Sequence, residues 1–309
     1  MFELIKLIKL HFKSLLVILS IGLHAQEKVI YILHTNNTNG ALENCYCPDK
    51  PYGAVEKRSV FVQEFMQKNP NSILVDSGDI FTMSKQFLKD SLMAEAYNLL
   101  PYDAILLGDQ EITMDKKHLK QFVEIMDKSI VSTNLKTEQS VKSIIVVRNG
   151  LKVGIIGILD EYAIKYYPQE IKEKIDLMDP YQEINNELNK LKNKTDIVVL
   201  LTHQGADKDV EMAKKLNDVD LIVGSHSQSL FESPEEFNNT LVVQAGKSGY
   251  QIGIVKISFS NGNVSKKVGR VDTMKFSLPD DPRIMSLINE YENRTGRINR
   301  NKLKRMNKN

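Results

Sequence analysis

Five short polar segments carry most of the residues that could do chemistry in this sequence of 309 residues. Each segment follows an apolar run of strand length, and together they supply carboxylates, carboxamides and imidazoles. Such groups, gathered at one edge of a sheet from distant parts of a chain, are the usual ligands of a divalent metal ion. The segments are His34–Gly40, Asp76–Asp79, Gly108–Glu111, Leu200–His203 and Gly224–Gln228.

The elements that must position these segments follow an alternating pattern. In the first half, strand-length runs alternate with segments whose apolar residues recur every three or four positions, which favours a parallel or mixed sheet covered by helices. Later strands follow one another closely, and Asn149-Gly150 and Asn261-Gly262 predict two hairpins, so we expect a second sheet packed on the first. The expected strands are Val29–Leu33, Ser72–Val75, Ala104–Leu107, Ser129–Ser132, Ser143–Val147, Lys152–Ile158, Asp196–Leu201, Leu221–Val223, Leu241–Gln244, Gly253–Ser258 and Val264–Val271. The expected helices are Ala54–Gln67, Lys85–Leu100, Lys116–Lys128, Tyr181–Lys192 and Asp207–Leu216.

The order, spacing and flanks of the polar segments resemble the calcineurin-like metallophosphoesterases, and within them the periplasmic 5'-nucleotidase/UDP-sugar hydrolase family. The resemblance covers nearly all of residues 26–282, which we expect to form one domain. It implies a four-layered α/β/β/α sandwich with the metal site at the strand ends. Many members of this family carry a further C-terminal domain that holds a base between aromatic rings, and the resemblance does not extend to that domain.

The resemblance implies two neighbouring metal positions, of which this sequence preserves one. The second position keeps Asp79, His203 and His226 and gains Asp109, so it holds two carboxylates and two imidazoles. Its combined charge of −2 matches a divalent cation. Mixed nitrogen and oxygen ligands suit Zn, Mn or Fe(II) better than a soft metal.

The first metal position has changed. Asn37 and Asn39 stand where the family has Asp and His, which leaves Gln228 and a share of Asp79 as its other ligands. We therefore expect one divalent ion per chain and weak binding, if any, at the first position. Gln110 follows Asp109 where the family has its catalytic imidazole, so the catalytic role expected for this pair is weak: a carboxamide cannot protonate a leaving group, a step typically worth about 10²–10⁴ in rate.

Two cysteines, Cys45 and Cys47, follow the first polar segment closely. A disulfide between residues two apart closes a small strained ring and is labile, so the pair predicts a redox site or an auxiliary metal site. Two idle thiols are the alternative. We expect His34 to have a structural role and Arg58 to lie on the surface of a helix.

The first 25 residues differ in composition from the rest. Lys6, Lys9 and Lys13 precede an apolar stretch over Leu15–Leu23, and Ala25 offers a small residue for cleavage. This pattern is typical of a secretory signal peptide, because the apolar run is too short for a bilayer core of about 30 Å. Cleavage predicts a periplasmic or secreted protein with no stable membrane insertion, and a retained anchor is the alternative.

The charge balance argues against nucleic acid as a partner. Removing residues 1–25 takes away three Lys and one Glu, so the formal charge falls from +2 to zero. A neutral body has no general attraction for nucleic acid or an anionic membrane. Residues 283–309 are a basic exception, expected to form a solvated helix that frays into a tail.

These residues are consistent with three different functions. The first is an exported 5'-nucleotidase-like hydrolase that cleaves a small phosphorylated substrate with a metal-activated water, weakened by the substitutions. The second is a non-catalytic descendant that binds a metal, an anion or a partner in the same pocket. The third is a redox or metal-handling protein that uses Cys45 and Cys47.

Overall fold

The structure is a computed structural model that describes residues 27–48, 51–299 and 302–303. The described strands form a five-stranded sheet and a six-stranded sheet. The first sheet has the order β11-β10-β1-β2-β3, with bounds Asn263–Thr273, Gln251–Ser260, Lys28–Thr35, Ser72–Asp76 and Ala104–Ile105. The second has the order β4-β5-β6-β7-β9-β8, with bounds Ser143–Arg148, Leu151–Leu159, Ile197–His203, Leu221–Val223, Thr240–Val243 and Glu235–Phe237.

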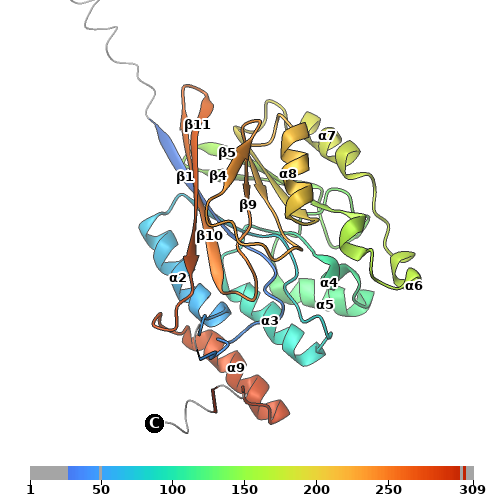
Figure 1. Cartoon of the computed structure of the whole chain (residues 1–309), viewed down its shortest axis with the longest axis vertical. Coiled ribbons are helices and arrows are strands. Elements are labelled where there is room, and N and C mark those ends of the chain that lie inside the picture. Colours follow the sequence, from blue (N-terminus) through green and yellow to red (C-terminus); the bar gives the residue numbers. More distant parts are fainter. Residues whose placement is uncertain (1–26, 49–50, 300–301, 304–309) are drawn as a thin grey trace, which may run out of the picture.

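Helices cover the outer face of each sheet, so the molecule has four layers in the order α/β/β/α (Figure 1). On the first sheet lie α2 (Val55–Lys68), α3 (Phe87–Leu99), α5 (Lys116–Met126) and α9 (Pro282–Thr295). On the second lie α7 (Pro180–Leu191) and α8 (Ala206–Lys215). Short helices α4 (Asp109–Ile112), η1 (Glu161–Ile164) and α6 (Gln169–Lys172) follow β3 and β5.

Alternation along the strands builds three apolar layers. In β1, Ile30 and Ile32 pack between the sheets, whereas Leu33 packs under the first helical layer. In β6, Val199 and Leu201 face the first sheet, whereas Leu200 packs under α7 and α8. Side chains of a strand point alternately to opposite faces, and here both faces are buried.

Parallel pairing brings the polar segments to one place. Strand β1 runs parallel to β2, and β2 to β3. In the other sheet β5, β6, β7 and β9 run parallel to one another. Carboxyl ends of parallel strands share one edge of a sheet, so the loops after β1, β2, β3, β6 and β7 can meet where the two sheets adjoin.

Most expected elements are confirmed. Both hairpins form, with Asn149, Gly150, Asn261 and Gly262 all at positive φ. The expected strand Ser129–Ser132 is wrong: Ile130 bridges Ile105 and Val131 bridges Val141, so the run makes single bridges to two different segments and does not pair along one strand.

The C-terminal helix is also less solvated than expected. One face of α9 buries Ile284 and Ile288 against the first apolar layer, and α9 contacts α2 and α3. Across the described ranges, no helix is both long and apolar enough to cross a membrane. The expected signal peptide lies outside the described residues.

Candidate metal centre

Four side chains converge where the two sheets adjoin. Asp79 follows β2, Asp109 begins α4, His203 ends β6 and His226 follows β7. One ligand atom from each of the four lies within 4.8 Å of the others. The first sheet thus supplies two carboxylates and the second sheet two imidazoles. We call these four residues the metal cluster.

The separations within the metal cluster suit a single ion. Asp109 Oδ1 lies 2.8 Å from His203 Nε2 and 3.0 Å from His226 Nδ1. Asp79 Oδ1 lies 3.4 Å from His203 Nε2. Two ligand atoms that are each about 2.1 Å from one zinc ion stand about 3.0 to 3.4 Å apart. Two of the three separations lie in this range and the third, 2.8 Å, is slightly shorter, so the residues present fit a divalent cation after a small adjustment.

The orientation of His203 is set from outside the cluster. Its Nδ1 lies 2.8 Å from the carbonyl oxygen of Ser77, which only accepts, so Nδ1 carries the hydrogen and Nε2 faces the carboxylates. Burial lowers the pKa of His203, but the charges and hydrogen bonds of Asp79 and Asp109 outweigh it and raise that pKa well above its usual value. Negative charge therefore exceeds positive charge around this imidazole, and a cation would be attracted there.

The loops that carry the metal cluster come unusually close. A Cβ on Gly78 would lie 2.5 Å from the backbone nitrogen of Gly108, and one on Gly108 would lie 2.7 Å from His203 Cε1. Only glycine allows this approach. Buried Glu111 joins the same two loops, because its carboxylate accepts from the backbone nitrogens of Asp79 and Gly108.

Several site residues have left-handed backbone conformations. Asp79 has φ 60° and His226 has φ 70°, while Asn37, Asn39 and Gln228 have φ 47°, 54° and 58°. Residues with a side chain seldom adopt positive φ, and such strain gathers at functional sites. These conformations support a functional role for the residues of both metal positions.

At the first metal position, the substituted residues hydrogen-bond to one another. Asn39 Nδ2 donates to the backbone oxygen of Asn37 at 2.8 Å, and Asn39 Oδ1 accepts from Gln110 Nε2 at 2.7 Å. Asn37 Oδ1 accepts from the hydroxyl of Ser225 at 3.1 Å. We call Asn37, Asn39 and Gln110 the amide chain.

A backbone carbonyl fixes the direction of the amide chain. The oxygen of Asn37 can only accept, so Asn39 must turn Nδ2 toward it and Oδ1 toward Gln110. Gln110 must then present Nε2 to Asn39, and its buried Oε1 is left with no partner among the described residues. The side-chain oxygens of Asn37 and Asn39, which a metal would need, are both engaged. Gln228 is half-buried and lies two residues beyond His226.

The surface position expected for Arg58 is wrong. Arg58 is fully buried, and its guanidinium donates to Thr38 Oγ1 at 3.0 Å and to the Tyr97 hydroxyl at 3.2 Å. The first turns of α2 pack beneath the loop after β1, so this face of the helix points inward. Arg58 thereby supports Thr38, which lies between the two asparagines of the amide chain.

His34 has the structural surroundings expected for it. The ring is buried against Gly253, where a Cβ would lie 1.9 Å from Nε2. Burial lowers the pKa of His34 to about 3, so the ring is neutral. It takes no part in the metal cluster.

Cys45 and Cys47 lie half-buried in the loop before α2. The backbone nitrogen of Cys47 donates to Cys45 Sγ at 3.2 Å. Burial is the main cause that raises the pKa of Tyr250 to about 12, and the neighbouring Cys45 adds to this rise. Tyr250 ends the loop whose Ser248 nitrogen bonds the backbone oxygen of Asn37, so one short loop separates the pair from the amide chain.

Two tyrosines that the sequence reading missed contact the metal cluster. The Tyr167 hydroxyl donates to Asp109 Oδ2 at 2.8 Å, and the Tyr162 ring stands edge-on to His226 at 6.1 Å between centroids. Their one signal in the sequence is position, since both follow β5 at the edge where the other loops gather.

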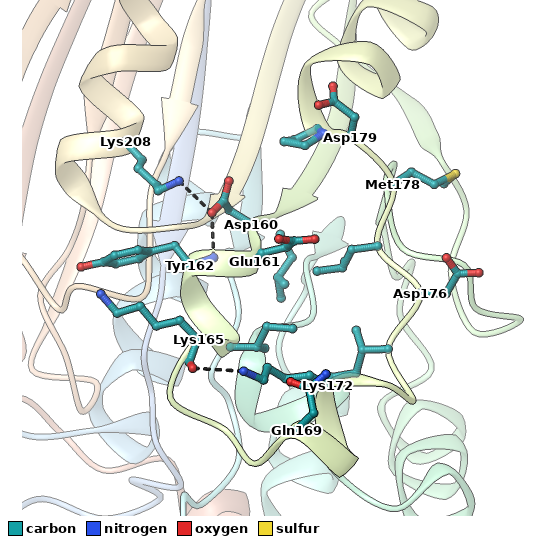
Figure 2. Close-up of a pocket in the computed structure, with 15 residues that line it drawn as sticks. Asp160, Glu161, Tyr162, Lys165, Gln169, Lys172, Asp176, Met178, Asp179 and Lys208 are labelled. Carbon is teal, nitrogen blue, oxygen red and sulfur yellow. Dashed lines mark hydrogen bonds and ion pairs between the residues drawn. The ribbon is translucent and has the colours of Figure 1, made fainter.

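Two adjoining cavities lie beside the cluster. One of about 930 Å³ is bounded by η1, α6 and residues 175–180, and none of the four cluster residues lines it (Figure 2). The other, of about 400 Å³, is lined by His226. Tyr162 and Lys208 line both, and Lys208 pairs with Asp160 at 2.8 Å. The smaller cavity is the one that reaches the metal cluster.

Known proteins of similar sequence include nucleotide-cleaving enzymes by name. A protein called 5NUC from Lutzomyia longipalpis is 28% identical over 311 residues, which covers 86% of this chain and 54% of that protein. The 5'-nucleotidase of Homo sapiens is 28% identical over 298 residues, which covers 84% of this chain and 52% of that enzyme. The chain thus spans about half the length of the curated relatives it matches.

The fold is shared with solved structures. The 5'-nucleotidase precursor from Thermus thermophilus superposes with a TM-score of 0.77 at 23% identity, over 86% of this chain and 59% of that one. No protein-family model matches the chain. The four-layered α/β/β/α fold expected from the sequence is confirmed.

Proposed function

Because the chain belongs to the 5'-nucleotidase family of calcineurin-like metallophosphoesterases, we propose that it hydrolyses small phosphate esters with one divalent metal ion. The observation that carries this proposal is the convergence of Asp79, Asp109, His203 and His226 within 4.8 Å. Zn, Mn and Fe(II) all suit this ligand set. When bound, such an ion supplies Lewis acidity toward a phosphate oxygen and lowers the pKa of water.

The protein's own groups hold and orient this chemistry. The two carboxylates balance the charge of the ion, and Ser77 holds His203 in the tautomer that a ligand needs. Glu111 fixes the spacing of the loops that carry Asp79 and Asp109. Gln110 has no ionisable proton, so activity toward esters with poor leaving groups is low.

The amide chain supports one ion in place of two. A second ion at the first position would compete with Ser225 and Gln110 for the side-chain oxygens of Asn37 and Asn39. Removing those bonds leaves buried polar groups unpaired, at about 1–3 kcal/mol each. Gln228 is at most a weak neighbour of the bound ion.

Export completes the proposal. The basic start, short apolar run and Ala25 of the first segment support cleavage and a periplasmic or secreted location. The substrate is then a small phosphorylated molecule outside the cytoplasm.

The test combines metal content with turnover. Natively exported protein should contain one divalent ion per chain by elemental analysis and should cleave activated aryl phosphates in a phosphoester panel. His203→Ala should lose both the ion and the activity. The matched control is His118→Ala, which removes a half-exposed imidazole outside the cluster and should change neither. An ion that stays after His203→Ala would refute the site.

A non-catalytic binding protein is the second candidate, and the amide chain favours it. Asn39 donates to the backbone oxygen of Asn37 and accepts from Gln110, so the three changed residues are bonded to one another, as expected of a pocket adapted to a new role. One ion per chain without turnover of any ester would establish this candidate. Thiol-dependent metal or redox behaviour would instead favour Cys45 and Cys47.

A further inference from the structure

Asp109 gives its two carboxylate oxygens to different partners. Oδ1 faces the metal cluster, 2.8 Å from His203 Nε2 and 3.0 Å from His226 Nδ1. Oδ2 faces away and accepts from the Tyr167 hydroxyl at 2.8 Å. The side chain of Asp109 is only 9% exposed, so water does not compete freely for either oxygen.

Tyr167 belongs to a segment that is held against the cluster at several points. Where the segment begins, the backbone nitrogen of Asp160 bonds the carbonyl oxygen of His203 at 3.3 Å. In its middle, Ala163 and Ile164 are buried. At its end, the nitrogen of Tyr167 bonds the oxygen of Ile164 at 3.0 Å. The hydroxyl is therefore placed by the fold and is not a mobile surface group.

The bond from Tyr167 to Oδ2 fixes the orientation of the Asp109 carboxylate with Oδ1 toward the cluster, and a turn that brought both oxygens to one ion would lengthen or break that bond. We propose that Tyr167 is a positioning residue that keeps Asp109 a one-oxygen ligand and thereby sets the metal preference of the site. This inference rests on the proposed function, because it assumes an ion in the metal cluster.

The number of carboxylate oxygens decides which ion is favoured. One oxygen from each carboxylate and one nitrogen from each imidazole give four ligands, which is the usual number for Zn²⁺. If Asp109 could turn and bind through both oxygens, the coordination number would rise toward the six that oxygen-rich Mn²⁺ sites prefer. Tyr167 blocks that turn.

The experiment uses the full chain, stripped of metal and reloaded. Affinities for Zn²⁺ and Mn²⁺ are measured by competition with a chromophoric chelator for the parent, Tyr167→Phe and Tyr166→Phe. Tyr166 is the matched control, because it is the next residue in the same segment but is 90% exposed. Loss of an outer partner of a metal ligand typically costs about 10–100-fold in affinity. We expect Tyr167→Phe to lose Zn²⁺ affinity by about tenfold and Mn²⁺ affinity by clearly less, and Tyr166→Phe to match the parent.

A spectroscopic measurement separates metal preference from general loosening of the site. The visible absorption of bound Co²⁺ weakens as its coordination number rises, so Tyr167→Phe should absorb less strongly than Tyr166→Phe. Equal loss of both metals with an unchanged Co²⁺ spectrum would overturn the inference, as would a Tyr167→Phe variant identical to the parent. If the parent binds no ion, the proposed function fails and the inference fails with it. If the parent binds an ion but Tyr167→Phe keeps the same preference for Zn²⁺ over Mn²⁺, the inference fails and the proposed function is unaffected.

Discussion

Rebuilding the first metal position by Asn37→Asp, Asn39→His and Gln110→His should add a second ion and raise ester hydrolysis. The structure explains why all three changes are needed together. Asn39 bonds both Gln110 and the backbone oxygen of Asn37, so changing Asn39 or Gln110 alone leaves a polar group of the other without its partner. Asn37→Asp alone keeps both bonds but supplies only one of the two ligands that a second ion needs.

The magnitudes follow from those bonds. Asn39→His alone removes two hydrogen bonds worth about 1 kcal/mol each and strands Gln110 Nε2, so it should destabilise the protein by about 2 to 3 kcal/mol. It should bring no second ion. The triple variant exchanges the amides for a carboxylate and two imidazoles, and the restored acid contributes about 10²–10⁴ in rate. Because the residues touch, the effects of the singles should not add up to that of the triple.

The assay is elemental analysis of exported protein, kcat/KM on aryl and alkyl phosphates, and thermal melting. We expect one ion per chain in the parent and each single variant, and two in the triple. A triple variant that stays at one ion would show that the amide chain is not what closes the first position. A triple variant with two ions and no gain in rate would show that the pocket has been remodelled, and the binding-protein candidate would lead.

Three further predictions concern other parts of the chain. Burial raises the pKa of Asp209 from 3.8 to about 7, so its contribution to stability is complete below pH 3.8 and is lost as the pH rises through 7. Asp209→Asn should reduce this loss of stability by up to a few kcal/mol at pH 8. Urea unfolding at pH 5 and pH 8 checks this, and an equal change in the free energy of unfolding between the two pH values for parent and variant would count against it. Replacing Cys45 and Cys47 by Ser should leave the melting temperature nearly unchanged, since a disulfide between residues two apart adds little loop-closure entropy. The same change should abolish thiol-dependent metal or redox behaviour. A large loss of stability, or two thiols that stay unreactive in oxidising buffer, would contradict this prediction. Intact mass of exported protein should show cleavage after Ala25, whereas a mature species that retains Met1 would indicate an anchored protein.

Local patterns in the sequence predicted much of the fold. Asn-Gly pairs at 149–150 and 261–262 specify tight hairpins because both residues tolerate positive φ, whatever the rest of the molecule does. Apolar runs and their polar ends identified the strands and the residues that meet at their carboxyl edge. Asp79, Asp109, His203 and His226 could be brought together on paper, because parallel strands must end at one edge and the resemblance supplied their order.

Partnership between distant side chains was decided only by the tertiary structure. Gln110 and Asn39 are 71 residues apart, and Tyr167 and Asp109 are 58 apart. No periodicity along the chain records such contacts, so the sequence predicted two lost ligands and a lost catalytic imidazole, and it did not predict that these three amides bond to one another. Arg58 was misplaced for the same reason: helical spacing shows which residues share a face, but what packs against that face depends on the whole fold. The sequence by itself determined which groups the site contains, and the packing of two sheets decided which of them remain available to a ligand.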